Sequence, residues 1–267
     1  MRFIDLFKAL IFGIVEGVTE WLPISSTGHL IILNELVSLG STDEFRELFF
    51  VAIQLGAILA VPVVSFRFKR NANFNLRILK LIAVGVIPAA IAGFLFDDFL
   101  DKFLYNYTVV SAMLILYGVV FVCISNKNKG RKVKIKNIED MGDGEAFLVG
   151  LFQMLSLIPG TSRSGATFLG GYAIGASRSV SAEFSFLMAI PIMLGATLLK
   201  GAKLAFSGYI LNGEECVLLF VGAISAFIVS VVTIKFLVDF VKKRSLLLFG
   251  IYRIILGFAV VIFFIFR

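Results

Sequence analysis

The sequence predicts an all-α polytopic membrane protein, with six full transmembrane helices and two re-entrant helix pairs arranged as an inverted repeat. Three observations lead to this fold class. The chain has 267 residues and is 59% hydrophobic, well above the roughly 45–50% of soluble domains. Its apolar residues fall into long runs, and its two halves share short sequence motifs. A soluble globular fold is therefore excluded.

Six apolar runs are long enough to cross a bilayer, which takes about 20 residues of helix. They are 44–66, 78–96, 108–125, 182–200, 216–240 and 246–266. Two further apolar stretches, 3–39 and 145–176, are each interrupted by Pro, Gly and Ser. Irregular backbone at membrane depth persists only where it is buried in protein or lines a wet cavity. We therefore expect both stretches to be re-entrant pairs whose breaks meet inside the protein.

The two halves of the chain resemble each other around these breaks. GIVE (13–16) and LPISS (22–26) in the first half match GLFQ (150–153) and IPGTS (158–162) in the second. The chain then divides into a first repeat (1–125), a basic cytoplasmic linker (126–144) and a second repeat (145–267). Each repeat crosses the membrane three times, which is an odd number, so the second repeat has the opposite orientation in the membrane. Inverted repeats with broken helices place their functional site at the repeat interface, near the midplane.

The basic residues set the expected orientation. They cluster in three loops, around 67–80, 127–136 and 242–244, whereas the 97–101 loop is acidic. The positive-inside rule places the basic loops in the cytoplasm and hence both termini outside. The same rule accounts for the net charge of +7, so we expect no nucleic-acid partner. Cys123 and Cys216 lie in apolar segments without a second ligand nearby, which favours small buried hydrophobes.

Glu16 and Glu20 stand one helical turn apart in the first broken stretch. An ionisable group near the bilayer centre costs on the order of 3 kcal/mol, so a retained pair indicates a function. At i and i+4 the two carboxylates share a helix face. They can hold a divalent cation, or one can act as a base. The alternative is a purely structural role, in which packing contacts satisfy the two carboxylates or the side chains snorkel at a helix end.

Three hydroxyl residues, Ser25, Ser26 and Thr27, precede a helical pattern over 28–39. One of them is expected to be the N-cap, and a helix N-terminus suits phosphate. His29, the only histidine, follows Ser26 by three residues and so lies beside it on a helix. This favours Ser26 as a nucleophile, with His29 or Glu20 in proton transfer. The alternative for the hydroxyl residues is helix capping, which would explain only one of the three. The alternative for His29 is a packing role without chemistry.

The second break carries one arginine, Arg163, among glycines and hydroxyl residues. The guanidinium is a planar fork of donors that fits phosphate oxygens, and glycine allows close backbone approach. Alternatively, Arg163 holds the two breaks together through Glu16 or Glu20. An arginine, two helix N-termini, a carboxylate pair and a serine beside a histidine together suit a phosphorylated lipid whose tail stays in the bilayer.

Two motifs give a family resemblance. ExxxE (16–20) with PxSSTGH (23–29), and PGxSRSxxT (159–167), resemble the two signature motifs of the bacterial undecaprenyl-pyrophosphate phosphatase family, also known for bacitracin resistance. The resemblance implies removal of the terminal phosphate from undecaprenyl pyrophosphate, a polyprenyl lipid, to recycle the carrier for peptidoglycan synthesis. It also implies dependence on Mg²⁺ or Ca²⁺ and a bacterial cytoplasmic (inner) membrane location with the site facing outside. A homodimer is one option for the assembly.

The resemblance also implies residue roles. Glu16 and Glu20 serve metal binding or acid–base chemistry, Ser26 is the nucleophile and His29 its partner. The residues expected to bind pyrophosphate are Arg163, Ser162, Ser164, Thr167, Ser25, Thr27, Gly28 and Gly160. Spacing alone leaves open whether Ser26 or His29 takes the phosphoryl group.

Two other classes compete with this interpretation. Lipid phosphatases related to vanadium haloperoxidases use two histidines, and this chain has one, so they are excluded. A polyprenyl-phosphate transporter or flippase fits the inverted repeat with broken helices. The pairing of Ser26 with His29 favours the enzyme, because transport needs no nucleophile.

Overall fold

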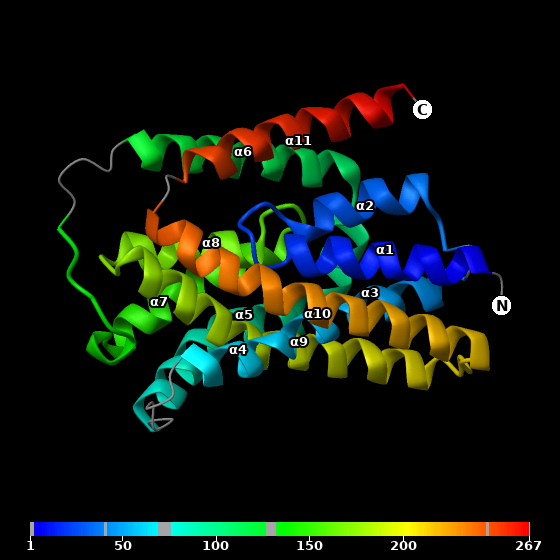
Figure 1. Ribbon diagram of the computed structural model, residues 1–267, viewed down its shortest axis with the longest axis horizontal. Helices are drawn as coiled ribbons and strands as arrows, with labels where there is room; N and C mark the ends of the chain where they lie inside the picture. Colours follow the sequence, from blue (N-terminus) through cyan, green and yellow to red (C-terminus); the bar gives the residue numbers. More distant parts are fainter. Residues whose placement is uncertain (1–2, 40–41, 69–75, 127–131, 244–245, 267) are drawn as a thin grey trace.

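A computed structural model describes residues 3–39, 42–68, 76–126, 132–243 and 246–266 as a bundle of helices (Figure 1). In chain order the elements are α1 (Phe3–Thr19), α2 (Ser26–Leu36), α3 (Asp43–Ile58), α4 (Ala60–Phe68), α5 (Leu76–Phe99), η1 (Leu100–Leu104), α6 (Tyr107–Asn126), η2 (Ile138–Asp140), α7 (Asp143–Met154), η3 (Leu155–Leu157), α8 (Arg163–Ala173), α9 (Arg178–Phe206), α10 (Gly213–Lys243) and α11 (Leu247–Ile265). Within these ranges the only β-type pairing is the bridge between Ile135 and Ala176.

Six helical segments are long and apolar enough to cross a membrane: Asp43–Val64, Leu76–Phe96, Tyr107–Ser125, Arg178–Phe206, Gly213–Val238 and Leu247–Ile265. They confirm the six predicted spans to within a few residues at most ends. The first of them is not one continuous helix, because α3 ends at Ile58 and α4 begins at Ala60. Large apolar side chains on their outward faces, such as Phe94 (73% exposed) and Phe220 (66%), suit contact with lipid.

The two broken stretches are helical hairpins, α1 with α2 and α7 with α8. The first hairpin is closed at its base by Lys8 Nζ, which donates to the carbonyl of Ser38 at 2.6 Å. The second is closed where the backbone of Ser177 donates to Ile135 at 2.9 Å. In Figure 1 the hairpins extend into the bundle from opposite ends, and their turns meet near its middle. Whether each enters and leaves a membrane by one face stays a prediction at this point.

Each hairpin is attached to a span from the other half of the chain. Helix α1 packs on α10, and α7 packs on α5. A Cβ on Gly13 would lie 2.3 Å from the carbonyl oxygen of Gly222, and a Cβ on Gly150 would lie 2.3 Å from that of Gly85. Such close approach of backbones is how helices associate in membranes. Glycine at these crossings therefore allows each hairpin helix to approach its partner span closely.

The prediction that Cys123 and Cys216 are buried is wrong, because both thiols are exposed on the outer surface of the bundle. Hydropathy indicates that a segment is apolar but not which face a residue occupies, and a bilayer accommodates a thiol as readily as a core does. Several residues of the predicted cytoplasmic loops lie outside the described part of the chain: Lys69, Arg70, Lys127, Lys129, Arg131 and Arg244, with the side chains of Arg67, Lys242 and Lys243.

Candidate active site

The two breaks share an unusual backbone conformation. Ser25 precedes α2 with φ 71°, and Ser162 precedes α8 with φ 73°. Among the described residues these are the only non-glycine residues with positive φ. Such conformations are strained for serine and cluster at functional sites. The two helices thus begin in the same way, although one belongs to each half.

This conformation suggests a different correspondence between the two breaks. The sequence comparison matched LPISS with IPGTS, which aligns Pro23 with Pro159. By backbone conformation Ser25 corresponds to Ser162, and each stands nine residues after Glu16 and Gln153 respectively. Without gaps, Ser26 then corresponds to Arg163, the first residue of α8. The two residues expected to attack and to bind phosphate therefore occupy the same position in the two halves.

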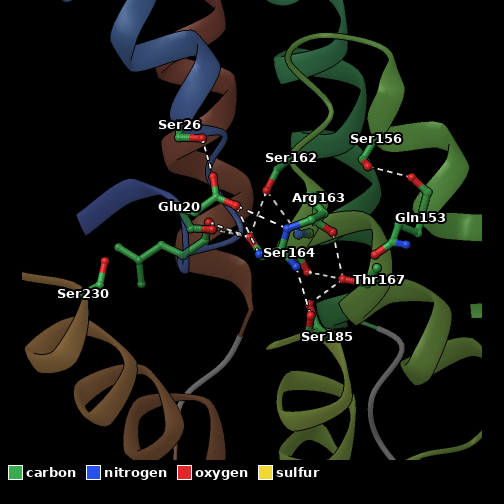
Figure 2. A network of polar contacts seen from close by, with 12 residues as sticks. Glu20, Ser26, Gln153, Ser156, Ser162, Arg163, Ser164, Thr167, Ser185 and Ser230 are labelled. Carbon is green, nitrogen blue, oxygen red and sulfur yellow. Dashed lines mark hydrogen bonds and ion pairs between the residues drawn. The ribbon is translucent and has the colours of Figure 1, made fainter. Parts of the chain in front are cut away.

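Glu20 joins these two positions (Figure 2). Ser26 Oγ donates to Glu20 Oε2 at 2.7 Å. Arg163 donates to Glu20 Oε1 through Nε at 3.2 Å and Nη2 at 3.1 Å. All three side chains are largely buried, with Glu20 8% exposed, so the charge-assisted bonds are strong. The structure therefore shows that Arg163 holds the two breaks together through a glutamate, which is Glu20.

The other side of Arg163 is held by α9 and by Trp21. Its Nη1 donates to the carbonyl of Ser185 at 2.9 Å. Thr167 Oγ1 bonds to the carbonyl of Arg163 at 2.8 Å and lies 2.5 Å from Ser185 Oγ. The guanidinium also lies over the Trp21 ring, 5.7 Å from its centroid, a favourable cation–π contact. Thr167 therefore acts on the position of Arg163 in this structure.

The hydroxyls of the second break contact the first break. Ser164 Oγ lies 3.0 Å from the carbonyl of Glu20 and 3.1 Å from that of Leu22. Ser162 Oγ accepts from the backbone of Gly165 at 3.1 Å, which caps α8. Ser25 occupies the equivalent place before α2, but its side chain makes no capping bond. Backbone N–H groups at the start of α2 are thus available for an anionic ligand.

Both ring nitrogens of His29 have partners other than Ser26. Its Nδ1 lies 2.8 Å from the carbonyl oxygen of Ser25, and its Nε2 lies 2.6 Å from the hydroxyl of Tyr252. A carbonyl only accepts, so Nδ1 carries the proton, and in the neutral ring Nε2 accepts from Tyr252. The proton of Ser26 is directed to Glu20 instead. This geometry favours Glu20 over His29 for proton transfer from Ser26.

Glu16 lies completely buried, one turn before Glu20. Neither of its carboxylate oxygens has a hydrogen-bond partner among the described residues, and the same holds for Ser25 Oγ. Buried carboxylates without partners are costly, so a ligand at this place would be stabilising. The described residues nevertheless contain no group of three or more His, Cys, Asp and Glu side chains able to hold a metal.

Arg253 of α11 ties the two breaks to each other, and sequence reasoning missed it. This fully buried side chain donates to the carbonyls of Pro23 at 3.2 Å, Gly160 at 2.8 Å and Met113 at 3.3 Å. Its signal was present in the sequence, because Arg253 is the one charged residue within Leu247–Ile265, and such residues mark functional regions of membrane proteins. Tyr252 and Ser185 gave no comparable signal.

The remaining predicted site residues fill structural positions around the breaks. Gly160 has φ 91°, and a Cβ there would lie 2.5 Å from the carbonyl oxygen of Val110. Close packing against α6 thus accounts for this glycine. A Cβ on Gly28 would be 3.0 Å from a methyl of Leu114, and Thr27 is half-buried in the first turn of α2.

We expect Arg253→Met to destabilise the folded protein by about 3 kcal/mol, because buried carbonyls of both breaks lose a charged donor. Thermal unfolding in detergent measures this effect. Ile255→Met, on the exposed side of the same helix, is the matched control and should leave the transition unchanged. Equal stability of the two variants would contradict the role of Arg253 in joining the breaks.

Comparison with known proteins supports a common ancestry over the whole chain. The family described as "Bacitracin resistance protein BacA" matches residues 9–259. An undecaprenyl-diphosphatase of Desulfitobacterium hafniense is 45% identical over 99% of this chain and 98% of its own. A relative with the same name from Enterococcus faecalis is 47% identical over 96% of this chain and 96% of its own. Another from Acetivibrio thermocellus is 47% identical over 98% of this chain and 98% of its own.

Proposed function

Because the chain belongs to the bacitracin resistance protein BacA family, we propose that this multi-pass membrane protein hydrolyses undecaprenyl diphosphate to undecaprenyl phosphate and inorganic phosphate. The observation that carries the proposal is the buried chain of contacts from Ser26 to Glu20 to Arg163. It joins a hydroxyl nucleophile, a base and a phosphate-binding cation across the two halves. A transporter would need no such arrangement.

In this mechanism Ser26 Oγ attacks the terminal phosphorus of the diphosphate. A bond forms from Ser26 Oγ to phosphorus, and the bridging P–O bond breaks, so undecaprenyl phosphate leaves with the electron pair. Glu20, which accepts the Ser26 hydroxyl at 2.7 Å, takes the proton and passes it to the leaving phosphate. Water then attacks the phosphorus of the phosphoserine while Glu20 takes a proton from the water. The bond from Ser26 Oγ to phosphorus breaks with its electron pair on Oγ, Glu20 returns the proton to Oγ, and inorganic phosphate leaves.

Arg163 would stabilise the negative charge on the transferred phosphoryl group. A guanidinium has five N–H donors, and the bonds to Glu20 and Ser185 described above use three of them. The remaining two N–H groups can bind phosphate oxygens while Arg163 stays anchored. The start of α2, where Ser25 does not cap the helix, would supply further donors.

We also propose that Glu16 and Glu20 hold a Mg²⁺ or Ca²⁺ ion. The supporting observation is that both oxygens of buried Glu16 lack a partner among the described residues. Such cations prefer six or more oxygen ligands, including carboxylates, water and substrate phosphate. Two glutamates alone are too few, so phosphate oxygens would complete the site. The ion would neutralise charge on the diphosphate.

Phosphate release from undecaprenyl diphosphate by the purified protein tests this proposal. We expect turnover that EDTA abolishes and that added Mg²⁺ or Ca²⁺ restores. Absence of turnover with either ion would overturn the phosphatase, whereas full turnover in EDTA would overturn only the metal. Proteoliposomes provide the comparison with the alternative function, because flipping of undecaprenyl phosphate without hydrolysis would favour a transporter.

For the architecture, we infer two re-entrant hairpins in an inverted repeat, in the bacterial cytoplasmic membrane, with the site opening to the outer side. The reciprocal packing of α1 on α10 and of α7 on α5 supports this arrangement. So do the equivalent contacts of Gly13 and Gly150 and the equal φ of Ser25 and Ser162. Two related hairpins that enter from opposite ends are expected from inverted halves.

Cysteine labelling tests this topology in a variant that lacks Cys123 and Cys216. We expect Lys102→Cys, in η1 after the end of α5, to react with a membrane-impermeant maleimide in intact cells. Lys136→Cys, before α7, should react only after permeabilisation, because the basic linker is predicted to be cytoplasmic. Both lysines are exposed, so access to water alone does not separate them. Labelling of Lys136→Cys in intact cells would contradict the inferred orientation.

A further inference from the structure

An apolar groove of about 520 Å³ runs between α5 and α9. Its volume is in the range of sites that hold extended apolar ligands. Most lining residues are small or aliphatic: Val86, Ala89, Ala90, Gly93, Phe94, Leu157, Pro191, Ile192, Gly195, Ala196, Leu198, Leu199 and Lys200. Only one of them is charged, so the groove suits an uncharged chain.

The small residues of this groove do not bring the two helices together. A Cβ on Gly195 would meet no atom within 4 Å among the described residues. By contrast, a Cβ on Gly85, elsewhere on α5, would contact Met188 at 3.0 Å. Small residues in membrane helices usually serve close helix packing. Here, at Gly195, they leave space beside the helix instead.

The inner end of the groove is lined by a residue of the second break. Leu157 belongs to the second break, six residues before Arg163, and a Cβ on Gly93 would lie 3.6 Å from it. On α9, Ile192 and Ala196 share the helix face of Ser185, about 10 and 16 Å further along the axis. Ser185 accepts the hydrogen bond from Arg163. The groove and the Arg163 anchor thus share one helix, α9.

An exposed ion pair lies beyond the outer end of the groove. Lys203 Nζ lies 2.7 Å from Asp98 Oδ1 and joins the ends of α9 and α5. Lys200, the one charged lining residue, stands at this end. The two helices are thus held together beyond the groove but leave an apolar channel between them.

We propose that this groove binds the polyisoprenoid chain of the substrate while its diphosphate lies at Arg163. The inference rests on the proposed phosphatase function and assigns a binding site to the rest of that substrate. An undecaprenyl chain is longer than a hydrocarbon core of about 30 Å is thick, so it must bend and lie along some surface. The groove offers it an apolar surface with Leu157 of the second break at its inner end and Lys200 at its outer end.

Filling the groove tests the proposal. Gly195→Phe and Ala90→Phe place a ring in it from α9 and from α5, and Gly201→Phe is the matched control, since Gly201 also faces open space on α9 but does not line the groove. We expect kcat/KM for undecaprenyl diphosphate to fall about tenfold in both filled variants through lost contacts with the chain. With geranyl diphosphate, whose chain is too short to extend along the groove to positions 90 and 195, all variants should stay within about twofold of the parent protein.

The outcomes distinguish failure of the groove proposal from failure of the proposed phosphatase function. Equal loss with the long and the short substrate would overturn the groove, because the site itself would then be damaged. Unchanged turnover of undecaprenyl diphosphate would also overturn it and leave ordinary membrane lipid as the occupant. A change in native mass of the filled variants would overturn it in favour of contact between two copies. No turnover by the unmodified protein would instead contradict the proposed function.

Discussion

Replacing Glu20 by glutamine is expected to lower kcat for phosphate release by about a thousandfold, within the range that proton transfer contributes. Glutamine keeps the shape of the side chain but cannot take the proton that Ser26 donates at 2.7 Å. It also removes the negative charge that Arg163 faces at 3.1 Å. Stopped assays with undecaprenyl diphosphate at saturating concentration measure the change in kcat directly.

The control separates catalysis from folding. Glu139→Gln makes the same chemical change on an exposed surface before α7, and its kcat should equal that of the parent protein. Thermal unfolding of both variants shows whether loss of the ion pair with Arg163 destabilises the protein. Turnover of folded Glu20→Gln within tenfold of the parent would remove Glu20 from the proton-transfer role.

Replacing Ser26 by alanine is expected to lower kcat by about a millionfold, a loss comparable with removal of the nucleophile in other covalent enzymes. The structure favours Ser26 over His29 as nucleophile because both ring nitrogens of His29 are occupied, by Ser25 and Tyr252. Acid-quenched parent protein should carry phosphate on Ser26, detected by mass spectrometry, and Ser26→Ala should carry none.

Ser207→Ala, at the exposed end of α9, is the matched control and should keep full activity. His29→Ala should retain the phosphoserine, because in this mechanism the histidine takes no part in forming it. Phosphohistidine at His29, together with substantial turnover by Ser26→Ala, would reverse the assignment of the nucleophile.

The spans were predictable because each depends on its own composition. The fifth helix is an example: the sequence predicted 78–96, and α5 occupies Leu76–Phe99. An apolar run of this length favours a membrane helix wherever it lies in the chain. The break between α3 and α4 at Leu59 was not predictable, because the segment remains apolar across it. The exposed faces of Cys123 and Cys216 escaped prediction for the same reason.

The site was predictable as a set of residues but not as a set of contacts. The motifs identified Glu20, Ser26 and Arg163, and the possibility that Arg163 pairs with a glutamate was one of two alternatives. The contact of Glu20 with Arg163 spans 143 residues of sequence, and that of His29 with Tyr252 spans 223. No local pattern encodes contacts over such separations. Local spacing therefore suggested His29 as the partner of Ser26, whereas the Ser26 hydroxyl donates to Glu20.

By itself the sequence determined that this protein lies in a membrane, that its halves are related, and which polar groups it keeps at the breaks, because hydropathy and motif are properties of short segments. The tertiary structure alone decided that Ser25 and Ser162 share a backbone conformation, that Glu20 accepts the hydrogen bond of Ser26, and that Arg253 joins both breaks. Those relations depend on how distant helices pack and on where buried donors find acceptors, and packing over such distances is a property of the whole fold.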